Sequence, residues 1–373
     1  FFFKEEDGIG DKLVTGVQTC ALPILTQDAA RGSRQLVRQL NRANPGAEIT
    51  VTGCYAQLAP QENAALPGVV RVVGNREKDD LVALVSGEPV PVFDLEPVSR
   101  DAAAGWAGRT RAFVKVQDGC DNACTFCVTT IARGEGRSRP LAEVVEEVRM
   151  LVAAGYREAV LTGVHLGSYG HDRGERNGLE ALVRAILSDT DIARLRLSSL
   201  EPWDLSPAFF DLWQDRRLCR HLHLPLQSGC DATLRRMARR TTQAQFRLLV
   251  NEARARVPDM CITTDVIAGF PGETDEEFAI SEAFIREMDF AGLHVFRYSK
   301  RPGTAAARMR GHVPEAVKKA RAARLNQLAA ELEARFAARF IGRQAEVLWE
   351  HVAGATEDGF LNVGYTDSYV RVR

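Results

Sequence analysis

Three closely spaced cysteines constrain this chain more than any other feature. Cys120, Cys124 and Cys127 are separated by three and by two residues, and they follow the β-branched run 114–116, which predicts a strand. Thiolates at this spacing on a loop converge on one small inorganic group, zinc or an iron–sulfur cluster. A structural zinc site needs a fourth protein ligand, and the next Cys or His is only His165. Three thiolates on a four-iron cluster leave one iron open for chemistry, so the spacing favours this cluster over a zinc knuckle or a chance grouping.

Strand-like runs alternate with helical patterns from Arg111 onward. The six runs are 112–117, 158–163, 194–200, 221–227, 261–268 and 292–298. The helix before the sixth run begins at a capping box, Thr274 with Glu277. Six βα units predict an α/β fold, a partial barrel whose site lies at the C-terminal ends of its strands. The cysteine loop leaves the first strand at that same end.

Residues just after the predicted strands are therefore candidate ligand contacts. The candidates are Gly163, Glu201, Gln227, Gly269 and Gly272. The glycines allow backbone to approach a ligand closely. Each residue alone reads equally well as a turn residue, but together, at one end of one barrel, they favour a binding site.

The remaining cysteines and histidines of the barrel carry a weaker signal. Cys219, Cys230 and Cys261 have no partner at metal spacing, so we expect buried, ordinary thiols. His221 and His223 alternate on one predicted strand and read either as metal ligands or as hydrogen-bonded residues that fill the barrel. The second interpretation is favoured because the cysteine loop already occupies the mouth of the barrel.

The flanking regions predict smaller domains. Residues 26–87 alternate an amphipathic helix at 27–43, strands at 49–54 and 69–75 and a helix at 78–85, which predicts a small parallel α/β sheet. A linker covers 88–110, the barrel 111–340, and two or three strands of a truncated β domain 341–373. Residues 1–25 lack any period and resemble translated adapter sequence, so we expect a non-native segment there.

Charge and composition exclude several classes of protein. The 48 basic residues balance 49 acidic ones, so any RNA contact must come from local patches. No apolar run is long enough to span a bilayer, and no signal peptide is evident. The eight cysteines are unevenly spaced, which argues against a disulfide scaffold. We expect reduced thiols, no membrane association and a cytoplasmic protein.

The cysteine motif, with Phe126 before its last cysteine, resembles that of the radical S-adenosylmethionine (SAM) enzymes. In that family the open iron binds SAM, and one electron cleaves it to a 5′-deoxyadenosyl radical. Further stretches resemble the tRNA methylthiotransferases, a subfamily of these enzymes; they are 51–57, 131–140, 161–170, 223–229 and 298–304. The runs 74–78 and 296–304 are most similar to the branch that acts on threonylcarbamoyladenosine.

The resemblance implies a function and its cofactors. It implies a radical SAM barrel, an N-terminal methylthiotransferase domain and a C-terminal TRAM-like β domain that grips tRNA. The expected reaction adds a methylthio group to C2 of N6-threonylcarbamoyladenosine at position 37, in the tRNA anticodon loop. The barrel's 4Fe–4S cluster lies on the three cysteines, SAM contacts Phe126 and the strand-end candidates, and flavodoxin or ferredoxin donates electrons. Alternatives are isopentenyladenosine or a ribosomal-protein aspartate as substrate, or a non-catalytic RNA-binding protein with a structural cluster.

The resemblance also implies a second 4Fe–4S cluster on three further cysteines. Cys54 matches one position, a second falls on Pro23, and Cys20 is three residues out of register. The third position would lie upstream of this sequence. We therefore expect the chain as written to lack the second cluster. Candidate RNA contacts, each equally compatible with a solvated ion pair, are Arg133, Arg137, Arg139, Lys300 and Arg301.

Overall fold

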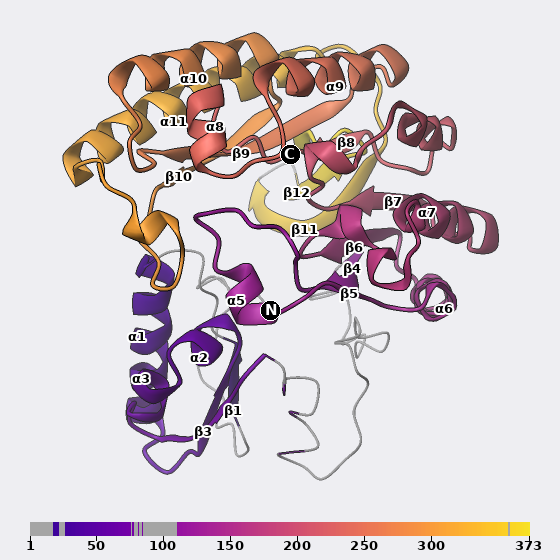
Figure 1. Ribbon diagram of the computed structural model, residues 1–373. Helices are drawn as coiled ribbons and strands as arrows, with labels where there is room; N and C mark the ends of the chain where they lie inside the picture. The colour runs from indigo at the N-terminus through magenta and orange to yellow at the C-terminus, as the bar shows by residue number, and fades with distance from the viewer. Residues whose placement is uncertain are drawn as a thin grey trace. The chain divides into compact units, whose positions relative to one another are not determined.

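The structure is a computed structural model that describes residues 18–21, 27–75, 77, 81, 84, 110–356 and 359–373, with backbone alone at 18–21, 27–29 and 356. The chain divides into two compact units, one of Phe1–Asp94 with Val128–Gly134 and one of Leu95–Cys127 with Glu135–Arg373. We call the second the barrel unit (Figure 1). Among the described residues no helix is long and apolar enough to cross a membrane.

The first unit contains a three-stranded parallel sheet in the order β1-β2-β3. The sequence predicts a parallel sheet with β2 and β3, whereas β1 falls in the segment 1–25 that was expected to be non-native. Its core is the apolar face of the first helix against the middle strand, with Val37, Ile49, Val51 and Tyr55 buried. The elements are β1 (Gln18–Ala21), α1 (Gln27–Ala43), β2 (Ile49–Thr52), α2 (Cys54–Leu58), α3 (Pro60–Ala64), β3 (Val69–Val73) and α5 (Thr129–Arg133). The predicted helix at 78–85 and linker at 88–110 fall almost entirely outside the described residues.

The barrel unit is built on a curled sheet of six parallel strands, which confirms the predicted partial barrel. The strands are β4 (Arg111–Asp118), β6 (Glu158–Gly163), β7 (Arg194–Leu197), β8 (His221–His223), β9 (Cys261–Ala268) and β10 (Gly292–Arg297). They neighbour one another in that order, and bridges Leu195–Leu218 and Ser199–His223 join β7 to β8. The short β5 (Arg137–Ser138) runs antiparallel to β4.

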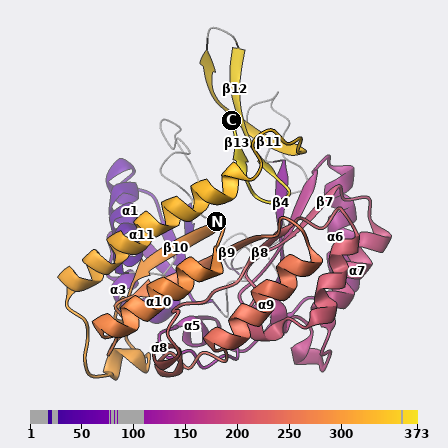
Figure 2. The same cartoon turned by 90° about the horizontal axis from the view of Figure 1, so that it is seen from above.

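Helices cover the outer face of this sheet (Figure 2). They are α6 (Leu141–Ala153), α7 (Gly178–Asp189), α9 (Gln243–Arg256), α10 (Asp275–Met288) and α11 (Glu315–Ala338), with shorter segments η2 (Leu166–Ser168), η3 (His171–Arg173), η4 (Pro202–Asp204), η5 (Pro207–Gln214), α8 (Asp231–Arg236) and η6 (Ala306–Arg308). Alternate strand residues such as Val114 and Leu161 bury against them. The intervening residues therefore form the opposite, inner face of the sheet. Thr274 and Glu277 form the predicted capping box.

Two strands end earlier than the sequence predicts. β7 ends at Leu197 and β8 at His223, whereas the apolar runs extend to 200 and 227. Pro225 has no N–H to continue the ladder after β8, and Pro202 opens η4 shortly after β7. Apolar runs therefore overestimated strand length where a proline follows.

The C-terminal residues form an antiparallel sheet in the order β11-β12-β13. Its strands are β11 (Val347–Thr356), β12 (Gly359–Thr366) and β13 (Arg371–Val372). Trp349, Val352 and Phe360 are exposed on it, whereas Thr366 and Ser368, at the turn before β13, are buried. This sheet therefore contributes few buried apolar side chains of its own.

Candidate active site

The cysteine loop leaves β4 and is held by two segments distant in sequence. The Thr125 N–H donates to the Met237 carbonyl (3.0 Å) and its hydroxyl to the Arg236 carbonyl (2.9 Å). The Thr125 carbonyl accepts from the N–H of Ala306 (2.9 Å). Phe126 lies edge-on to Phe270, with ring centroids 6.5 Å apart. Backbone bonds and this aromatic anchor thus fix the loop before any cofactor binds.

A buried arginine connects Cys124 to the end of β7. Arg239 donates to both carboxylate oxygens of Glu201 (3.0 and 2.5 Å), to the Pro225 carbonyl (2.5 Å) and to Cys124 Sγ (3.8 Å). Burial raises the pKa of the Cys124 thiol, and Arg239 opposes this by favouring the thiolate. A guanidinium beside a cysteine offsets part of the negative charge that a thiolate-bound cluster brings.

A carboxylate–histidine pair lies beside Cys120. His165 Nε2 is 2.6 Å from Asp204 Oδ2, and its Nδ1 is 3.3 Å from the side-chain nitrogen of Asn122. Burial lowers the pKa of His165, but hydrogen bonds to Asp204 and Cys120 outweigh it and raise the pKa to about 10. The pair thus places a hydrogen-bond donor against a cysteine sulfur.

The glycines near this pair are required by close packing. A Cβ at Gly167 would lie 2.2 Å from Asp204 Oδ2, so only glycine lets Asp204 reach His165. A Cβ at Gly163 would lie 3.0 Å from the Gln117 side-chain oxygen, which accepts from the His165 N–H (2.8 Å). Packing against Gln117 therefore explains the glycine at position 163 without any ligand.

Gly269 and Gly272 have positive φ angles of 75° and 78°. A Cβ at Gly269 would meet Lys318 at 2.2 Å, whereas a Cβ at Gly272 would lie 3.3 Å from Arg236 Nε. A Gly269 variant would therefore disturb α11 as well as any cofactor. That SAM contacts these two glycines stays a prediction.

Gln227 is strained at the end of β8. Its φ angle is 70°, in the left-handed region that L-residues other than Asn and Asp seldom adopt. Its backbone bridges to β9 through the Asp265 carbonyl (2.8 Å) and the Ile267 N–H (2.9 Å). Backbone strain of this kind clusters at ligand sites, so Gln227 stays a candidate contact.

The predicted RNA contacts differ in accessibility. Arg139 is 3% exposed and pairs with the buried Glu147, so its assignment to RNA was wrong: its role is to hold α6. Arg137 is half-buried and lies 3.4 Å from Asp118. Lys300 is exposed. Arg301 is buried, and its Nη2 has no partner among the described residues.

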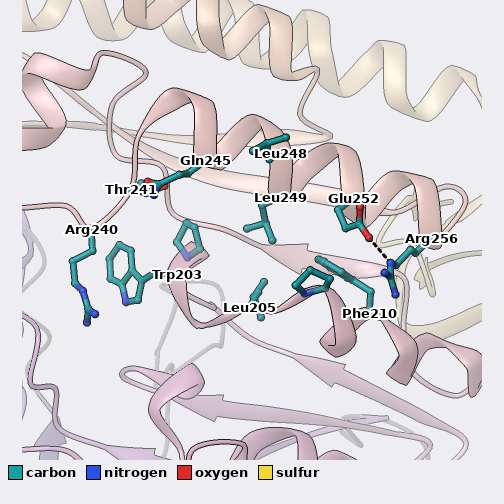
Figure 3. Close-up of a pocket in the computed structure, with 12 residues that line it drawn as sticks. Trp203, Leu205, Phe210, Arg240, Thr241, Gln245, Leu248, Leu249, Glu252 and Arg256 are labelled. Carbon is teal, nitrogen blue, oxygen red and sulfur yellow. Dashed lines mark hydrogen bonds and ion pairs between the residues drawn. The ribbon is translucent and has the colours of Figure 1, made fainter.

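One cavity lies away from the cysteine loop. It has a volume of about 670 Å³ and is lined by Trp203, Leu205, Phe210 and Leu249 with residues 240–256 of the loop and helix α9 (Figure 3). Trp203 connects the cavity to the site, because the guanidinium of Arg239 lies 4.5 Å from its ring.

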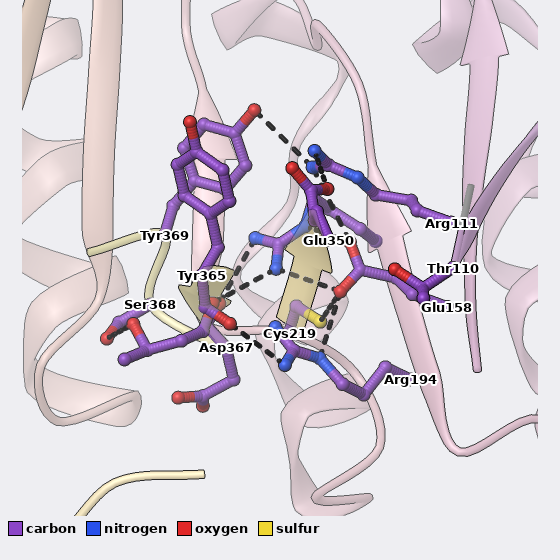
Figure 4. Close-up of polar contacts among 12 residues, drawn as sticks. Thr110, Arg111, Glu158, Arg194, Cys219, Glu350, Tyr365, Asp367, Ser368 and Tyr369 are labelled. Carbon is purple, nitrogen blue, oxygen red and sulfur yellow. Dashed lines mark hydrogen bonds and ion pairs between the residues drawn. The ribbon is translucent and has the colours of Figure 1, made fainter. Parts of the chain in front are cut away.

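The opposite end of the sheet is closed by a buried ion cluster (Figure 4). Glu158 accepts a hydrogen bond from Arg196 Nε (2.7 Å) and forms ion pairs with Arg194 Nε (2.9 Å) and Arg111 (3.9 Å). Arg196 also donates to the carbonyls of residues 366 and 367, on the turn before β13. The ring of Tyr369 stacks on His221 at 4.7 Å. The C-terminal turn therefore seals this end of the inner face.

The other cysteines of the barrel unit behave as predicted. Cys219, Cys230 and Cys261 are buried and free. Burial raises the pKa of Cys219 to about 11 and that of Cys261 to about 12. Such thiols stay protonated and are poor metal ligands.

Cys54 lies in the first unit, at the start of α2. Its sulfur accepts from the side-chain nitrogen of Asn75 (3.4 Å), which also donates to the Ala132 carbonyl (2.8 Å). In the parallel pairing of β1 with β2, Cys20 stands beside Val51. Cys54 lies three positions after Val51, beyond the end of β2 at Thr52. The backbone register thus agrees with the offset of Cys20 found in the sequence.

Arg239 and Asp204 were missed by sequence reasoning. Neither follows a strand directly, so the rule that selected Glu201 could not select them. Gly167, two residues after His165, was the nearest sequence signal, because a glycine allows another group to approach the backbone closely.

Comparison with protein families agrees with this geometry. The family model described as the Radical SAM superfamily matches residues 114–285. Threonylcarbamoyladenosine tRNA methylthiotransferase MtaB from Bacillus subtilis is 39% identical over 367 residues, which is 95% of this chain and 80% of that protein. The protein of the same name from Thermotoga maritima is 39% identical and covers 95% and 81%. A tRNA-2-methylthio-N(6)-dimethylallyladenosine synthase from Geobacillus thermodenitrificans is 33% identical, over 98% and 71%.

Solved structures share the fold at low sequence identity. The radical S-adenosylmethionine methyltransferase TsrM from Kitasatospora setae has a TM-score of 0.58 at 19% identity, covering 78% of this chain and 65% of that one. The cobalamin-dependent S-adenosylmethionine radical enzyme OxsB has a TM-score of 0.53 at 11% identity, covering 86% and 48%. These likenesses show the fold alone.

Proposed function

The chain belongs to the radical SAM tRNA methylthiotransferases, most similar to the threonylcarbamoyladenosine branch, and from this premise we propose that it adds a methylthio group to C2 of N6-threonylcarbamoyladenosine at position 37 of tRNA. The observation that carries the proposal is the identity of 39% over 95% of the chain. In domain terms, we assign residues 26–87 to a methylthiotransferase domain, 111–340 to the barrel and 341–373 to a TRAM-like domain.

The residues at the cysteine loop suit a 4Fe–4S cluster. Cys120, Cys124 and Cys127 supply three thiolates, and Arg239 supplies a compensating positive charge beside one of them. When bound, the cluster supplies one electron for the reductive cleavage of SAM. The residues of the chain hold the cluster ligands in position. Hydrogen bonds of Thr125 fix the cysteine loop, and Asp204 orients the His165 ring beside Cys120. Hydrogen bonds to cluster sulfurs tune the reduction potential.

SAM fits the strand ends on the same side. We assign its contacts to Phe126, Gly163, Glu201, Gln227, Gly269 and Gly272. Glu201 is oriented by a two-pronged bond with Arg239, so its carboxylate is held in place before SAM arrives. Arg301, in the segment after β10, has a buried Nη2 without a hydrogen-bond partner among the described residues, and an anionic group of SAM or RNA would satisfy it.

The second cluster of the family would use Cys54. The described residues of the first unit place no second cysteine level with it, since Cys20 is offset along β1. We therefore propose that the barrel unit binds its own cluster and cleaves SAM, that Cys54 is one ligand of the second cluster, and that Cys20 is not a ligand of it.

The partners follow from the proposed reaction. We propose the tRNA anticodon loop as substrate, a flavodoxin or ferredoxin as electron donor, and a cytoplasmic location. A base in a single-stranded loop can be turned out of its stack, which gives the inner face access to C2. The exposed Lys300 and the half-buried Arg137 are the phosphate contacts we assign.

Mass spectrometry of tRNA nucleosides from a strain that lacks the gene tests the proposal. We expect loss of 2-methylthio-N6-threonylcarbamoyladenosine and its return on complementation. Loss of the methylthiolated dimethylallyl nucleoside instead would assign the chain to the second group of relatives. Unchanged tRNA would indicate a protein substrate, such as the ribosomal aspartate, or a non-catalytic role.

A further inference from the structure

Three polar residues on the inner face of the barrel have no part in the cluster or in the proposed SAM contacts. His223, Asp265 and His294 come from three neighbouring strands, β8, β9 and β10. Asp265 and His294 are register partners, and the rings of His223 and His294 lie 5.6 Å apart. We call these residues the polar triad.

The hydrogen bonds of His223 fix which of its ring nitrogens donates and which accepts. A carboxylate only accepts, so His223 Nε2, 3.2 Å from Asp265 Oδ1, is the donor. In the neutral ring the His223 Nδ1 then accepts from the Thr263 hydroxyl (2.9 Å), which in turn accepts from His221 Nε2 (3.2 Å). Burial and the nearby Arg196 hold the pKa of His221 well below its usual range, so this ring is the neutral start of the chain. The chain ends on Asp265.

The far side of the triad remains available to a ligand. The Asp265 side chain is 25% exposed, and its second carboxylate oxygen has no partner among the described residues. His294 is exposed and likewise makes no hydrogen bond within the described part of the chain. Leu293 and Val295 on either side of His294 pack against the core, which places His294 on the inner face. The triad therefore presents one anionic acceptor and one imidazole side by side.

The position of the triad suits a substituent of the substrate base that extends beyond the reacting C2 atom, toward the closed end of the barrel. His223 and Asp265 lie four residues before Gln227 and Gly269 along their strands, roughly 13 Å nearer the closed end. The stacked rings of His221 and Tyr369 lie still nearer the closed end. In adenine, C2 and C6 are both bonded to N1, and the C2–H and C6–N6 bonds diverge. A base that presents C2 to the strand ends therefore directs its N6 group along the inner face.

From this geometry we infer that the polar triad binds the threonylcarbamoyl group of the substrate nucleoside and selects for it. Asp265 accepts from an N–H or hydroxyl of that group, and His294 donates to its carboxylate. A dimethylallyl group offers neither partner, so its burial here would leave a carboxylate and an imidazole unpaired, which selects against it. The inference rests on the proposed function, because it names the residues that choose between the two nucleosides.

A binding ratio tests the inference. The probes are two anticodon stem-loops identical except for threonylcarbamoyl or dimethylallyl on the base at position 37, titrated anaerobically with the full, cluster-loaded chain by fluorescence anisotropy. We expect the chain to bind the threonylcarbamoyl probe more tightly. Asp265→Asn and His294→Leu should each reduce that preference about tenfold, the worth of one lost charge-assisted hydrogen bond. His171→Leu, at an exposed histidine on η3, is the matched control and should leave the ratio unchanged.

The outcomes separate the inference from the proposed function. A preference in the unmodified chain that both triad variants retain would overturn the inference alone. No preference in the unmodified chain would overturn the proposed substrate and the inference with it. Iron content and melting temperature establish that each variant is folded. A bound zinc ion that the two triad variants lose, found by elemental analysis, would make the triad a metal site and would also overturn the inference.

Discussion

The two ends of the barrel unit's sheet use the same side-chain types in opposite ways. At the closed end Glu158 receives arginines from its own sheet, and Arg196 also bonds backbone of the C-terminal turn. At the cysteine end Arg301 is buried with an unpartnered nitrogen, and Gln227 is held in a strained conformation. The closed end joins its charges to one another and to the C-terminal turn, although Arg194 Nε and Nη2 have no hydrogen-bond partner among the described residues. The cysteine end combines an unpartnered nitrogen with backbone strain at the strand ends. Mutations at the two ends should therefore separate stability from function.

The largest expected effect is at the cysteine loop. Replacing Cys120, Cys124 or Cys127 by Ala should abolish reductive SAM cleavage, because each removes one of three thiolates. Reconstituted chain should hold about four irons in a 4Fe–4S cluster, and each variant should lose most of them. Iron analysis and chromatography of 5′-deoxyadenosine measure this. Cys261→Ala, at a buried thiol outside the loop, is the control; SAM cleavage by a triple Ala variant would refute the cluster assignment.

The next effect is on stability, at the closed end. Glu158→Gln should destabilise the chain by about 3–5 kcal/mol, because it leaves Arg196 and Arg194 buried without their anion. Burial raises the pKa of Glu158, but Arg196 and the other arginines outweigh it and lower the pKa below its usual value. This contribution should therefore be present at neutral pH and be lost on acidification, as the carboxylate protonates.

Urea unfolding at pH 7 and at acidic pH measures the loss at Glu158. Glu175→Gln removes a carboxylate from an exposed ion pair with Arg173 and should change stability little. Equal losses in both variants would show that the buried cluster is no more important than a surface pair.

Sequence reasoning recovered the parts that depend on local pattern. The six barrel strands and the capping box at Thr274 follow from periodicity and from fixed spacings, and the structure has them. The family follows from motifs whose spacing the chemistry dictates, and the relatives bear it out. The placement of SAM against the strand-end residues is untested by the fold and stays a prediction.

Long-range pairings were beyond the sequence. Arg239 reaches Glu201 across 38 residues, and Arg196 reaches the turn at 366 across 170 residues. Nothing local to an arginine tells which carboxylate or carbonyl the fold brings to it. Arg139 was predicted to contact RNA because it lies near the cysteine loop in the sequence. The fold instead pairs it with the buried Glu147 on α6, a partner that the sequence does not indicate.

A smaller effect should come from Arg301, where stability and binding oppose each other. Arg301→Met should stabilise the ligand-free chain by about 1 kcal/mol, because a buried donor without a partner costs about that much. The same change should weaken binding of SAM or of a tRNA stem-loop, measured by calorimetry and anisotropy. Arg310→Met, at an exposed position nearby, should change neither. If Arg301→Met destabilises the ligand-free chain, the guanidinium has a structural partner and is no ligand site.

The smallest effect separates strain from function at Gln227. Its φ angle of 70° costs a side-chain-bearing residue about 1 kcal/mol that glycine avoids, although glycine also loses more entropy on folding. Gln227→Gly should therefore raise the free energy of unfolding by at most about 0.5 kcal/mol. Ala238→Gly relieves a similar φ angle of 55° and should give a similar gain, which makes it the matched control for strain. Only Gln227→Gly should also weaken SAM binding, because it removes an amide side chain at the strand end. If both variants bind SAM as the unmodified chain does, the strain at Gln227 belongs to the β8–β9 connection and not to the cofactor site.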